Sequence, residues 1–464
     1  MNKIIRKFLV GILAVSVLFG AAGCGEDIIS ESSKESEEES SEISESSVSE
    51  ISVSEISMPE VIQKNRLTVY VYEDKDTEGF WSAVAEEYEK IEERIEVEII
   101  ADENIASKVR SDILSGKIPD VIYLPSNDTS GVTKALIADK ALADISDVIE
   151  KISDSTAKGA VDGLFSKPYG TDKNYIAPFG CKIGGIWYNA AAFSEDFEFS
   201  GSIDDFEGLA SGLKKGENLI AFAGEEFKSL KSIVAPIIYM SAGKNACDAV
   251  YDITKSVWKD ENVSNAINTI YSFASKKTVS ATSVEYDEAD VVWAIARGDA
   301  AFGILTDAEA AYSKAVERYG TPNVEATEKD KEFSENLKAM RLTRLNTPTV
   351  GDGERVVFAE MGAVYIPLES KNIEPAKRFI EFLYSDTVKE ISAEKGIYAP
   401  AKEIVGENEI IYCYRLPMML GATDDFENIF YENIANLLNG KTTVKAVIEN
   451  MTTASGALEG YKIK

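Results

Sequence analysis

The chain has 464 residues, and its 79 acidic side chains outnumber the 48 basic ones to give a formal net charge of −31. This balance excludes the basic surface that a nucleic-acid-binding protein needs. The chain contains no histidine, which excludes Ser-His-Asp and Cys-His catalysis and most zinc and transition-metal sites, although carboxylate and lysine chemistry remains available.

The first residues predict export from the cell. A basic start leads into an apolar run over residues 8–19, which is too short to span a bilayer. The small residues 21–23 and then Cys24 follow, an order that resembles the bacterial lipobox, with Ala21 where leucine is commonest. Residues 1–23 are expected to be a lipoprotein signal peptide, and Cys24 the acylated N-terminus on the extracellular face of the cell membrane. A plain secretory signal with an incidental cysteine stays the alternative.

Residues 24–64 are expected to form an acidic, Ser/Glu-rich tether. Between 26 and 60 the sequence is almost only Ser, Glu, Ile and Val, with Ser-Glu-Ile-Ser repeated and no aromatic residue. Such a segment cannot bury enough apolar surface to offset chain entropy, and its like charges extend it. A tail with no selected role has the same composition.

The remaining chain, from about 65 to 464, exceeds the size of one compact core, so two lobes are expected. Its cysteines are Cys181, Cys247 and Cys413, and their odd number excludes a fully paired disulfide set within the body. We interpret them as small buried apolar side chains.

The body begins with alternating strands and helices. The pattern predicts strands over 67–72, 95–100 and 121–124 and helices over 80–91 and 105–114. This order is typical of a parallel sheet covered by helices, in which ligands bind at the carboxyl ends of the strands. Those ends carry residues 73–74 and 125–128.

Six segments then resemble, in the same order, the signature segments of the extracellular solute-binding proteins of carbohydrate ABC transporters, family 1. The segments are KVRSDILSGKIPDVIYL (108–124), ALADISDVI (141–149), YIAPFGCKIGGIWYN (175–189), VVWAIARGDAAFGI (291–304), MGAVYIPLESKNIEPAKRFIEFLYS (361–385) and NIANLLNGKTTVKAVIENM (433–451). Together these segments are distributed over nearly all of residues 65–464.

The resemblance implies an α/β, two-lobe periplasmic-binding-protein-like fold of type II, with a ligand cleft between lobes joined by a hinge. Lobe one would hold 65–182 plus 345–402, and lobe two 183–344 plus 403–464. It also implies a monomeric binding protein rather than an enzyme, which captures a mono- or oligosaccharide, delivers it to ABC permease subunits, and uses no cofactor and no metal.

Candidate ligand-binding residues follow from the strand ends and crossings of that fold. They are Glu73, Asp74, Asn127, Asp128, Phe179, Lys182, Thr306, Asp307, Glu360 and Met361. Polar side chains suit sugar hydroxyls, and Phe179 could stack on a sugar ring. For each polar residue an ordinary solvated loop position is an equal alternative. Many family members carry a stacking Trp shortly after the strand that here ends at Leu305, and this chain has Thr306 and Asp307 there instead.

Two other functions stay open. The same fold could present its ligand to a signalling partner. A carboxylate-based glycosidase is the enzymatic alternative, although paired acids are expected on any solvated helix of so acidic a chain. Trp293 lies on an apolar helix face and is expected in the core. Trp187 and Tyr188 are neighbours in a predicted strand, so one of the two must face the core.

Overall fold

The computed structural model describes residues 64–75, 77–126, 128, 130–161, 166–193, 218–224, 245, 258–275, 285–323, 325–344, 349–350, 354–401, 409–413 and 424–458. Arg66–Lys464 is one compact unit, and the elements discussed below belong to it, except that the first strand begins one residue earlier, at Asn65. The expected signal peptide, Cys24 and the tether up to residue 63 lie outside the described residues, as do Asn127 and Cys247.

The first sheet contains the strands that the opening pattern predicts. Its strands are β1 (Asn65–Val71), β2 (Ile95–Ala101), β3 (Val121–Leu124), β4 (Ala177–Ile183), β9 (Thr349–Val350), β10 (Glu354–Tyr365) and β11 (Glu409–Cys413). Their order is β11-β10-β3-β1-β2, with β4 and β9 also paired to β10. Strands β1 and β3 are parallel, as the pattern predicts, whereas β10 runs antiparallel to β3.

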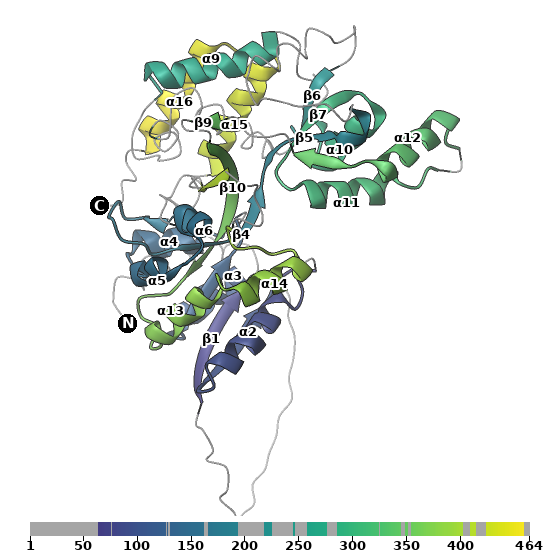
Figure 1. The fold of residues 1–464 in the computed structure, drawn as a ribbon. Coiled ribbons are helices and arrows are strands. Elements are labelled where there is room, and N and C mark those ends of the chain that lie inside the picture. The colour runs from purple at the N-terminus through teal and green to yellow at the C-terminus, as the bar shows by residue number, and fades with distance from the viewer. Residues whose placement is uncertain are drawn as a thin grey trace, which may run out of the picture. The chain divides into compact units, whose positions relative to one another are not determined.

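The helices of this part lie around the sheet (Figure 1). They are α2 (Phe80–Ile91), α3 (Ile105–Ser115), α4 (Val132–Ala138), α5 (Ser146–Lys151), α6 (Ser155–Val161), α13 (Ile373–Phe382) and α14 (Asp386–Lys395). Helix α2 has the bounds that its apolar spacing predicts, because one face buries Phe80, Trp81, Val84, Ala85 and Tyr88. Helix α3 ends at Gly116, whose left-handed backbone favours glycine.

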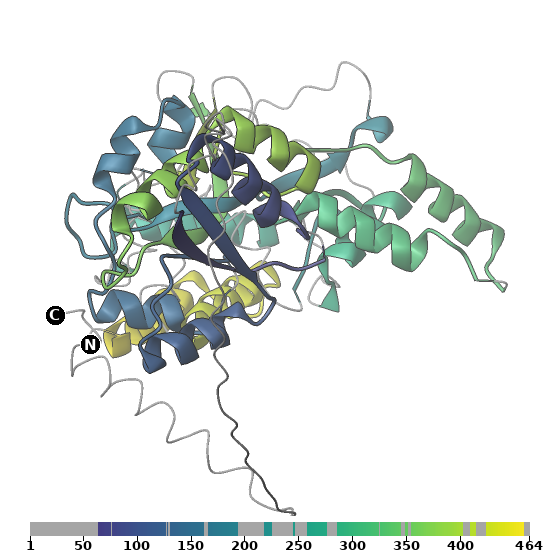
Figure 2. The same cartoon turned by 90° about the horizontal axis from the view of Figure 1, so that it is seen from below.

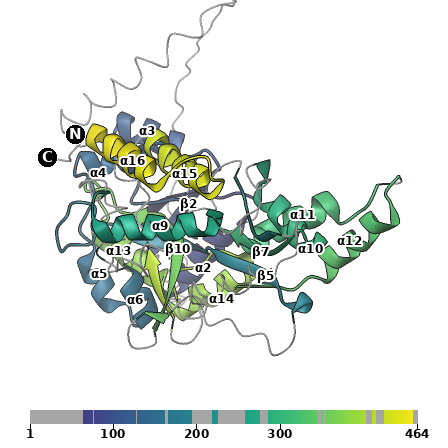
Figure 3. The same cartoon turned by 90° about the horizontal axis from the view of Figure 1, so that it is seen from above.

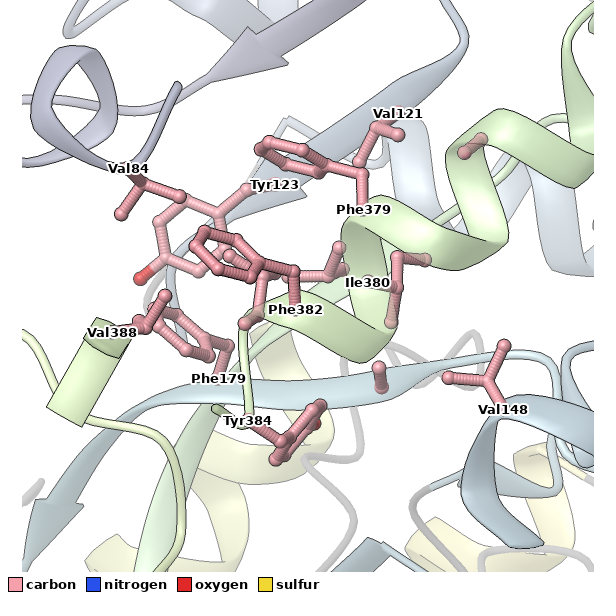
Figure 4. Packing of buried hydrophobic residues seen from close by; sticks show 14 of the residues in the cluster. Val84, Val121, Tyr123, Val148, Phe179, Phe379, Ile380, Phe382, Tyr384 and Val388 are labelled. Atoms are coloured by element: carbon pink, nitrogen blue, oxygen red, sulfur yellow. The ribbon is translucent and has the colours of Figure 1, made fainter. Parts of the chain in front are cut away.

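The core of the first sheet is rich in aromatic rings (Figure 4). The indole of Trp81 has its ring centroid 4.9 Å from that of Tyr123 and 5.6 Å from that of Phe179. Helices α13 and α14 close over this cluster with Phe379, Val388 and their neighbours. Large, tightly packed rings such as these bury much apolar surface and fix the position of strands β3 and β4.

A buried carboxylate joins the amino-terminal ends of β1 and β3 to the start of α13. Asp120 is 4% exposed, and its carboxylate accepts hydrogen bonds from the backbone N–H of Thr68 at 2.8 Å, the hydroxyl of Ser370 at 2.7 Å and the amide of Asn372 at 3.1 Å. This arrangement explains why an acid precedes the buried strand in the Pro-Asp-Val motif.

The second sheet has its own helices and core. Its strands are β5 (Gly185–Asn189), β6 (Asn218–Phe222), β7 (Ala300–Leu305) and β8 (Leu342–Arg344), in the order β6-β7-β5-β8. Helices α10 (Glu288–Arg297), α11 (Ala308–Tyr319) and α12 (Glu328–Ala339) contact one another, and α10 packs on β5, β6 and β7 (Figure 3). A Cβ at Gly303 would come within 2.5 Å of Val291 and 2.9 Å of Ile295, so glycine at this position lets α10 approach the sheet.

Trp293 of α10 packs at the edge of this core rather than within it. The residue is half-buried, and its indole stacks on the ring of Tyr319, with centroids 4.9 Å apart and planes 9° apart. The guanidinium of Arg297 lies 5.7 Å from the indole on the same helix, a favourable cation–π distance.

A third group of helices packs together. It consists of α9 (Glu261–Ser275), α15 (Asp424–Leu438) and α16 (Val444–Leu458), and Figure 2 shows α15 and α16 side by side in yellow. Trp258, just before α9, is 2% exposed and donates its indole N–H to the hydroxyl of Ser455 at 2.7 Å. The hydrogen bond satisfies the polar atom of an otherwise apolar buried side chain.

Strand β10 is long enough to pair twice. Its first half, Arg355–Ala359, runs parallel to β11, and its second half pairs with β3 and β4. Residues 403–464 are predicted to belong to the second lobe, but β11 within them pairs with β10 of the first sheet. Cys413 lies at the end of β11, and Cys181 in β4 is buried.

Candidate functional site

Four polar side chains meet where β4 leaves the first sheet for β5. Lys182 of β4 lies opposite Glu360 of β10 in the strand register, so the two side chains lie on the same face. The ammonium of Lys182 is 3.2 Å from Oδ2 of Asp307, which follows β7. Ser126, which follows β3, donates its hydroxyl to Oε2 of Glu360 at 3.3 Å. We call Ser126, Lys182, Asp307 and Glu360 the crossing cluster.

Two glycines allow the strands below the crossing cluster to come together. Gly362 interrupts the register between β10 and β4 just after Glu360, and a Cβ there would lie 2.7 Å from the ring of Tyr123 and 2.8 Å from the carbonyl oxygen of Leu124. Gly180 has φ +67, and a Cβ there would collide with the Tyr123 hydroxyl. Both positions therefore require glycine, one for close approach and the other also for its left-handed backbone.

Glu73 and Asp74 lie at the carboxyl end of β1 and shape the loop before α2. The carboxylate of Asp74 accepts hydrogen bonds from the backbone N–H of Thr77 at 3.1 Å, from its hydroxyl at 2.9 Å and from the hydroxyl of Tyr72 at 3.2 Å. Glu73 accepts from the N–H of Gly79 at 3.1 Å. Burial raises the pKa of Glu73, against the opposing effect of backbone N–H donors.

Asp128 has a comparable local role after β3. Its carboxylate accepts from the backbone N–H of Ser130 at 3.1 Å and from the hydroxyl of the same residue at 2.9 Å. Such an Asx turn fixes the approach to α4. Three predicted carboxylates, those of Glu73, Asp74 and Asp128, thus have partners within their own loops and retain partial exposure.

Phe179 and Met361 have buried side chains. Phe179 is fully buried among the aromatic rings of the first core, 5.8 Å from Phe80 and 5.6 Å from Trp81 by ring centroid. Met361 is 1% exposed. Neither side chain offers a face to a solute in this structure.

Thr306 and Asp307 are held in place by an acid that the sequence analysis does not single out. Glu288, the first residue of α10, accepts hydrogen bonds from the hydroxyl and backbone N–H of Thr306 at 2.6 and 2.8 Å. Asp307 itself caps α11 by accepting from the N–H of Ala310 at 3.1 Å. In so acidic a chain no local sequence pattern distinguishes Glu288 from the other acidic residues.

The amino-terminal end of β5 brings further polar groups to the same edge of the second sheet. Gly185 pairs with Leu305, and Arg344 pairs with Trp187. The methylenes of Arg344 lie 3.3 Å from where a Cβ of Gly185 would be. The indole nitrogen of Trp187 is buried and has no hydrogen-bond partner among the described residues. The strand pattern predicts that one of Trp187 and Tyr188 faces the core; the structure packs Trp187 against the second core, and the pairing between strands places Arg344 beside it.

The described residues also bear on metal binding and on membrane insertion. Within them, no set of Cys, Asp or Glu side chains is grouped so that it could hold a metal ion. No helix in the same residues is both long and apolar enough to cross a membrane.

The chain belongs to the bacterial extracellular solute-binding proteins, because the model of that family matches residues 74–390. No curated protein matches the chain significantly. Solved structures confirm the two-lobe α/β fold of such proteins.

The chain is 14% identical to the bacterial solute receptor AcbH, which is described as having an exclusive substrate preference for β-D-galactopyranose, with a TM-score of 0.66 over 85% of this chain and 100% of that one. It is 15% identical to a probable secreted solute-binding lipoprotein from Streptomyces coelicolor, with a TM-score of 0.60 over 84% and 98% of the two chains. It is also 15% identical to the solute-binding protein RafE in complex with raffinose, with a TM-score of 0.53 over 85% and 100%. At these identities the likeness concerns the fold.

Proposed function

We propose that this protein captures a mono- or oligosaccharide outside the cell by hinged closure of its two lobes and delivers it to an ABC importer. Membership in the solute-binding family supports a binding role, and the raffinose and galactopyranose named as ligands of two similar proteins support a carbohydrate. The observation that carries the proposal is the crossing cluster, because it joins polar groups that follow or belong to β3, β4, β7 and β10.

The chemistry of the crossing cluster suits sugar hydroxyls. Each hydroxyl donates one hydrogen bond and accepts others, so it needs acceptors and donors side by side. The carboxylates of Asp307 and Glu360 accept, the ammonium of Lys182 donates, and the hydroxyl of Ser126 does both. Hydrogen bonds to charged groups are stronger than neutral ones.

The proposed site extends from the crossing cluster to the neighbouring strand ends. It includes the predicted residues Glu73, Asp74, Asn127, Asp128, Lys182, Thr306, Asp307 and Glu360, together with Ser126. We leave out Phe179 and Met361 because their side chains are buried. Closure over the ligand makes the loaded state distinguishable to the permease, and the ligand favours closure only as far as it binds the closed form better.

A carbohydrate panel tests the ligand class. The full chain is heated with galactose, raffinose and other mono- and oligosaccharides, and separately with amino acids and polyamines. A true ligand at a hundredfold excess over its dissociation constant stabilises the protein by about 2.7 kcal/mol. Stabilisation by non-carbohydrates alone would contradict the proposal, as would recovery of a sugar in hydrolysed form.

A pair of lysine variants tests the site. Lys182 and Lys151 have equal side-chain exposure of 54%, and each ammonium lies close to a carboxylate, at 3.2 Å from Asp307 and 3.0 Å from Glu381. Lys182→Gln is expected to weaken binding of the stabilising sugar roughly tenfold, since it removes a charged hydrogen-bond donor. Lys151→Gln should leave affinity unchanged. Equal affinities in the two variants would remove Lys182 from the site.

We also propose that Cys24 carries the lipid anchor and that residues 24–64 hold the folded body off the membrane. The secreted lipoprotein among the similar structures supports this arrangement. Cys24→Ser should release the protein from the membrane fraction into the medium or a soluble fraction, because two acyl chains anchor a protein far more firmly than polar contacts do. Retention of Cys24→Ser in the membrane fraction at the wild-type level would refute the anchor.

A further inference from the structure

The carboxylate of Glu288 is directed at the end of β7. Its Oε1 accepts both the hydroxyl and the backbone N–H of Thr306, at 2.6 and 2.8 Å, and its Oε2 accepts the N–H of Asp307 at 3.4 Å. These two N–H groups follow the last residue of β7, Leu305. One side chain of α10 therefore fixes the backbone of the two residues that leave the strand.

Asp307 divides its carboxylate between two partners. Oδ1 accepts the N–H of Ala310 at the start of α11 at 3.1 Å, and Oδ2 lies 3.2 Å from the ammonium of Lys182. With its backbone held by Glu288 and one oxygen held by the helix, Asp307 has its other oxygen directed toward Lys182.

We propose that Glu288 is a positioning residue for the ligand site, which holds Thr306 and Asp307 so that the Asp307 carboxylate faces Lys182. This inference rests on the proposed function, because it assigns Glu288 to the same site. Glu288 acts through Asp307 and touches no ligand itself.

A role in starting α10 does not account for Glu288. The helix already has a complete capping box, in which Asp287 accepts from the N–H of Asp290 at 2.9 Å and Asp290 accepts from the N–H of Asp287 at 3.0 Å. Burial raises the pKa of Glu288, against the opposing effect of its three hydrogen bonds. A partly buried acid is unfavourable unless it satisfies other groups, and the groups that Glu288 satisfies are those of the β7–α11 loop.

The chain provides a matched control for Glu288. Glu328 is likewise the first residue of its helix, α12, and lies within a capping box made by Thr327 and Asp330. Its side chain is 92% exposed and pairs with Lys331 within one turn. The variants are Glu288→Ala, Glu288→Gln and Glu328→Gln, all made in the full chain.

The first measurement needs no ligand. A water-soluble carbodiimide condenses a carboxylate with a contacting ammonium into an amide, so it reports the Lys182–Asp307 pair as a crosslinked peptide in mass spectrometry. Wild type and Glu328→Gln should give equal yields. Glu288→Ala should lower the yield roughly tenfold and speed hydrogen exchange at the N–H groups of Thr306 and Asp307 by a similar factor.

Glu288→Gln keeps an acceptor for Thr306 but places an amide N–H₂ toward the N–H of Asp307, so an intermediate yield is expected. This variant also provides the comparison if Glu288→Ala does not fold. An unchanged crosslink yield in Glu288→Gln and in any folded Glu288→Ala would overturn the proposal, as would the absence of this crosslink in wild type. A structural role alone would lower the melting temperature without changing the yield.

The second measurement separates this inference from the proposed function. Raffinose and galactose are titrated against wild type and the variants by calorimetry. If a sugar binds, its affinity should fall in parallel with the crosslink yield, and a lower yield with unchanged affinity would overturn the positioning role. If no carbohydrate binds wild type, the proposed ligand class fails, while the crosslink still decides whether Glu288 positions Asp307.

Discussion

Replacing Asp120 by alanine tests the most connected buried acid of the first sheet. Its carboxylate binds the backbone of β1 through Thr68 and the segment before α13 through Ser370 and Asn372. The backbone N–H of Asp120 also donates to the carbonyl of Thr68 at 2.8 Å. Asp120→Ala preserves this backbone pairing but removes every partner of the carboxylate at once.

The expected loss follows from the groups left without partners. A buried donor that loses its acceptor costs about 1–3 kcal/mol. Ser370 is 8% exposed and Thr68 half-buried, whereas Asn372 can reach water. We therefore expect Asp120→Ala to lower the free energy of unfolding by about 3 kcal/mol. Asp120→Asn keeps one acceptor oxygen and should lose about half as much.

Urea unfolding of the full chain measures these losses, followed by circular dichroism. Hydrogen exchange of a peptide covering 66–72 locates the loss, because the backbone N–H of Thr68, which loses its acceptor, belongs to that segment. Asp147→Ala is the control, since Asp147 is half-exposed and makes a surface ion pair with Lys377 at 2.8 Å, a kind of pair worth about 0–1 kcal/mol. Equal unfolding midpoints for the Asp120 and Asp147 alanine variants would refute the reasoning.

Two further predictions concern a glycine and an acid. Gly180→Ala should cost about 3 kcal/mol or more, because the methyl group combines left-handed strain with overlap on Tyr123; Gly170→Ala, at φ +66 with open space around it, should show the strain alone in the same thermal melt. Burial disfavours the charged form of Asp144, but hydrogen bonds with Lys173 and Ser146 favour that form more strongly. The pKa of Asp144 therefore falls to about 2. Its stabilisation should be present above pH 4 and lost toward pH 2, and after solvent screening it should amount to about 1 kcal/mol. In Asp144→Asn the melting temperature should depend less on pH over that range. A pH dependence equal to that of the wild type would contradict the lowered pKa of Asp144.

Local patterns predict the first sheet well for a physical reason. The strand predicted over 67–72 is found at Asn65–Val71, and the helix predicted over 80–91 is found at those bounds, because the periodic spacing of apolar residues that defines such an element is carried by residues close together in the sequence. The pairing between strands, in contrast, does not follow from local patterns. Nothing local indicates that β11 pairs with β10, since that contact joins segments about fifty residues apart.

In the candidate site, too, some features follow from the local sequence and others depend on distant contacts. Residues at strand ends can be named from the sequence, because the alternation of elements locates the ends. The exposure of a side chain depends on the whole core, and this is why Phe179 lies among buried rings. The partners of Asp74 and Asp128 are close in sequence, but an aspartate can bond to any of several neighbouring backbone groups in turns and helix caps, so composition alone does not tell which partner is bound. Glu288 acts on Thr306 across 18 residues, beyond any short motif.

The energy of the Lys182–Asp307 pair bears on how the proposed closure would work. Their side chains are 54% and 30% exposed, so the pair contributes about 0–1 kcal/mol. Shifting a population of lobes from about 1:99 to 99:1 needs about 5.5 kcal/mol of differential binding. The ion pair is far too weak to hold the lobes closed by itself, and a sugar hydroxyl that displaced it would lose little. A ligand that binds the carboxylates and the ammonium together in the closed form gains several charge-assisted hydrogen bonds, each about 1.5–3 kcal/mol. A weak, exposed pair at the crossing therefore suits a protein whose closure depends on its ligand.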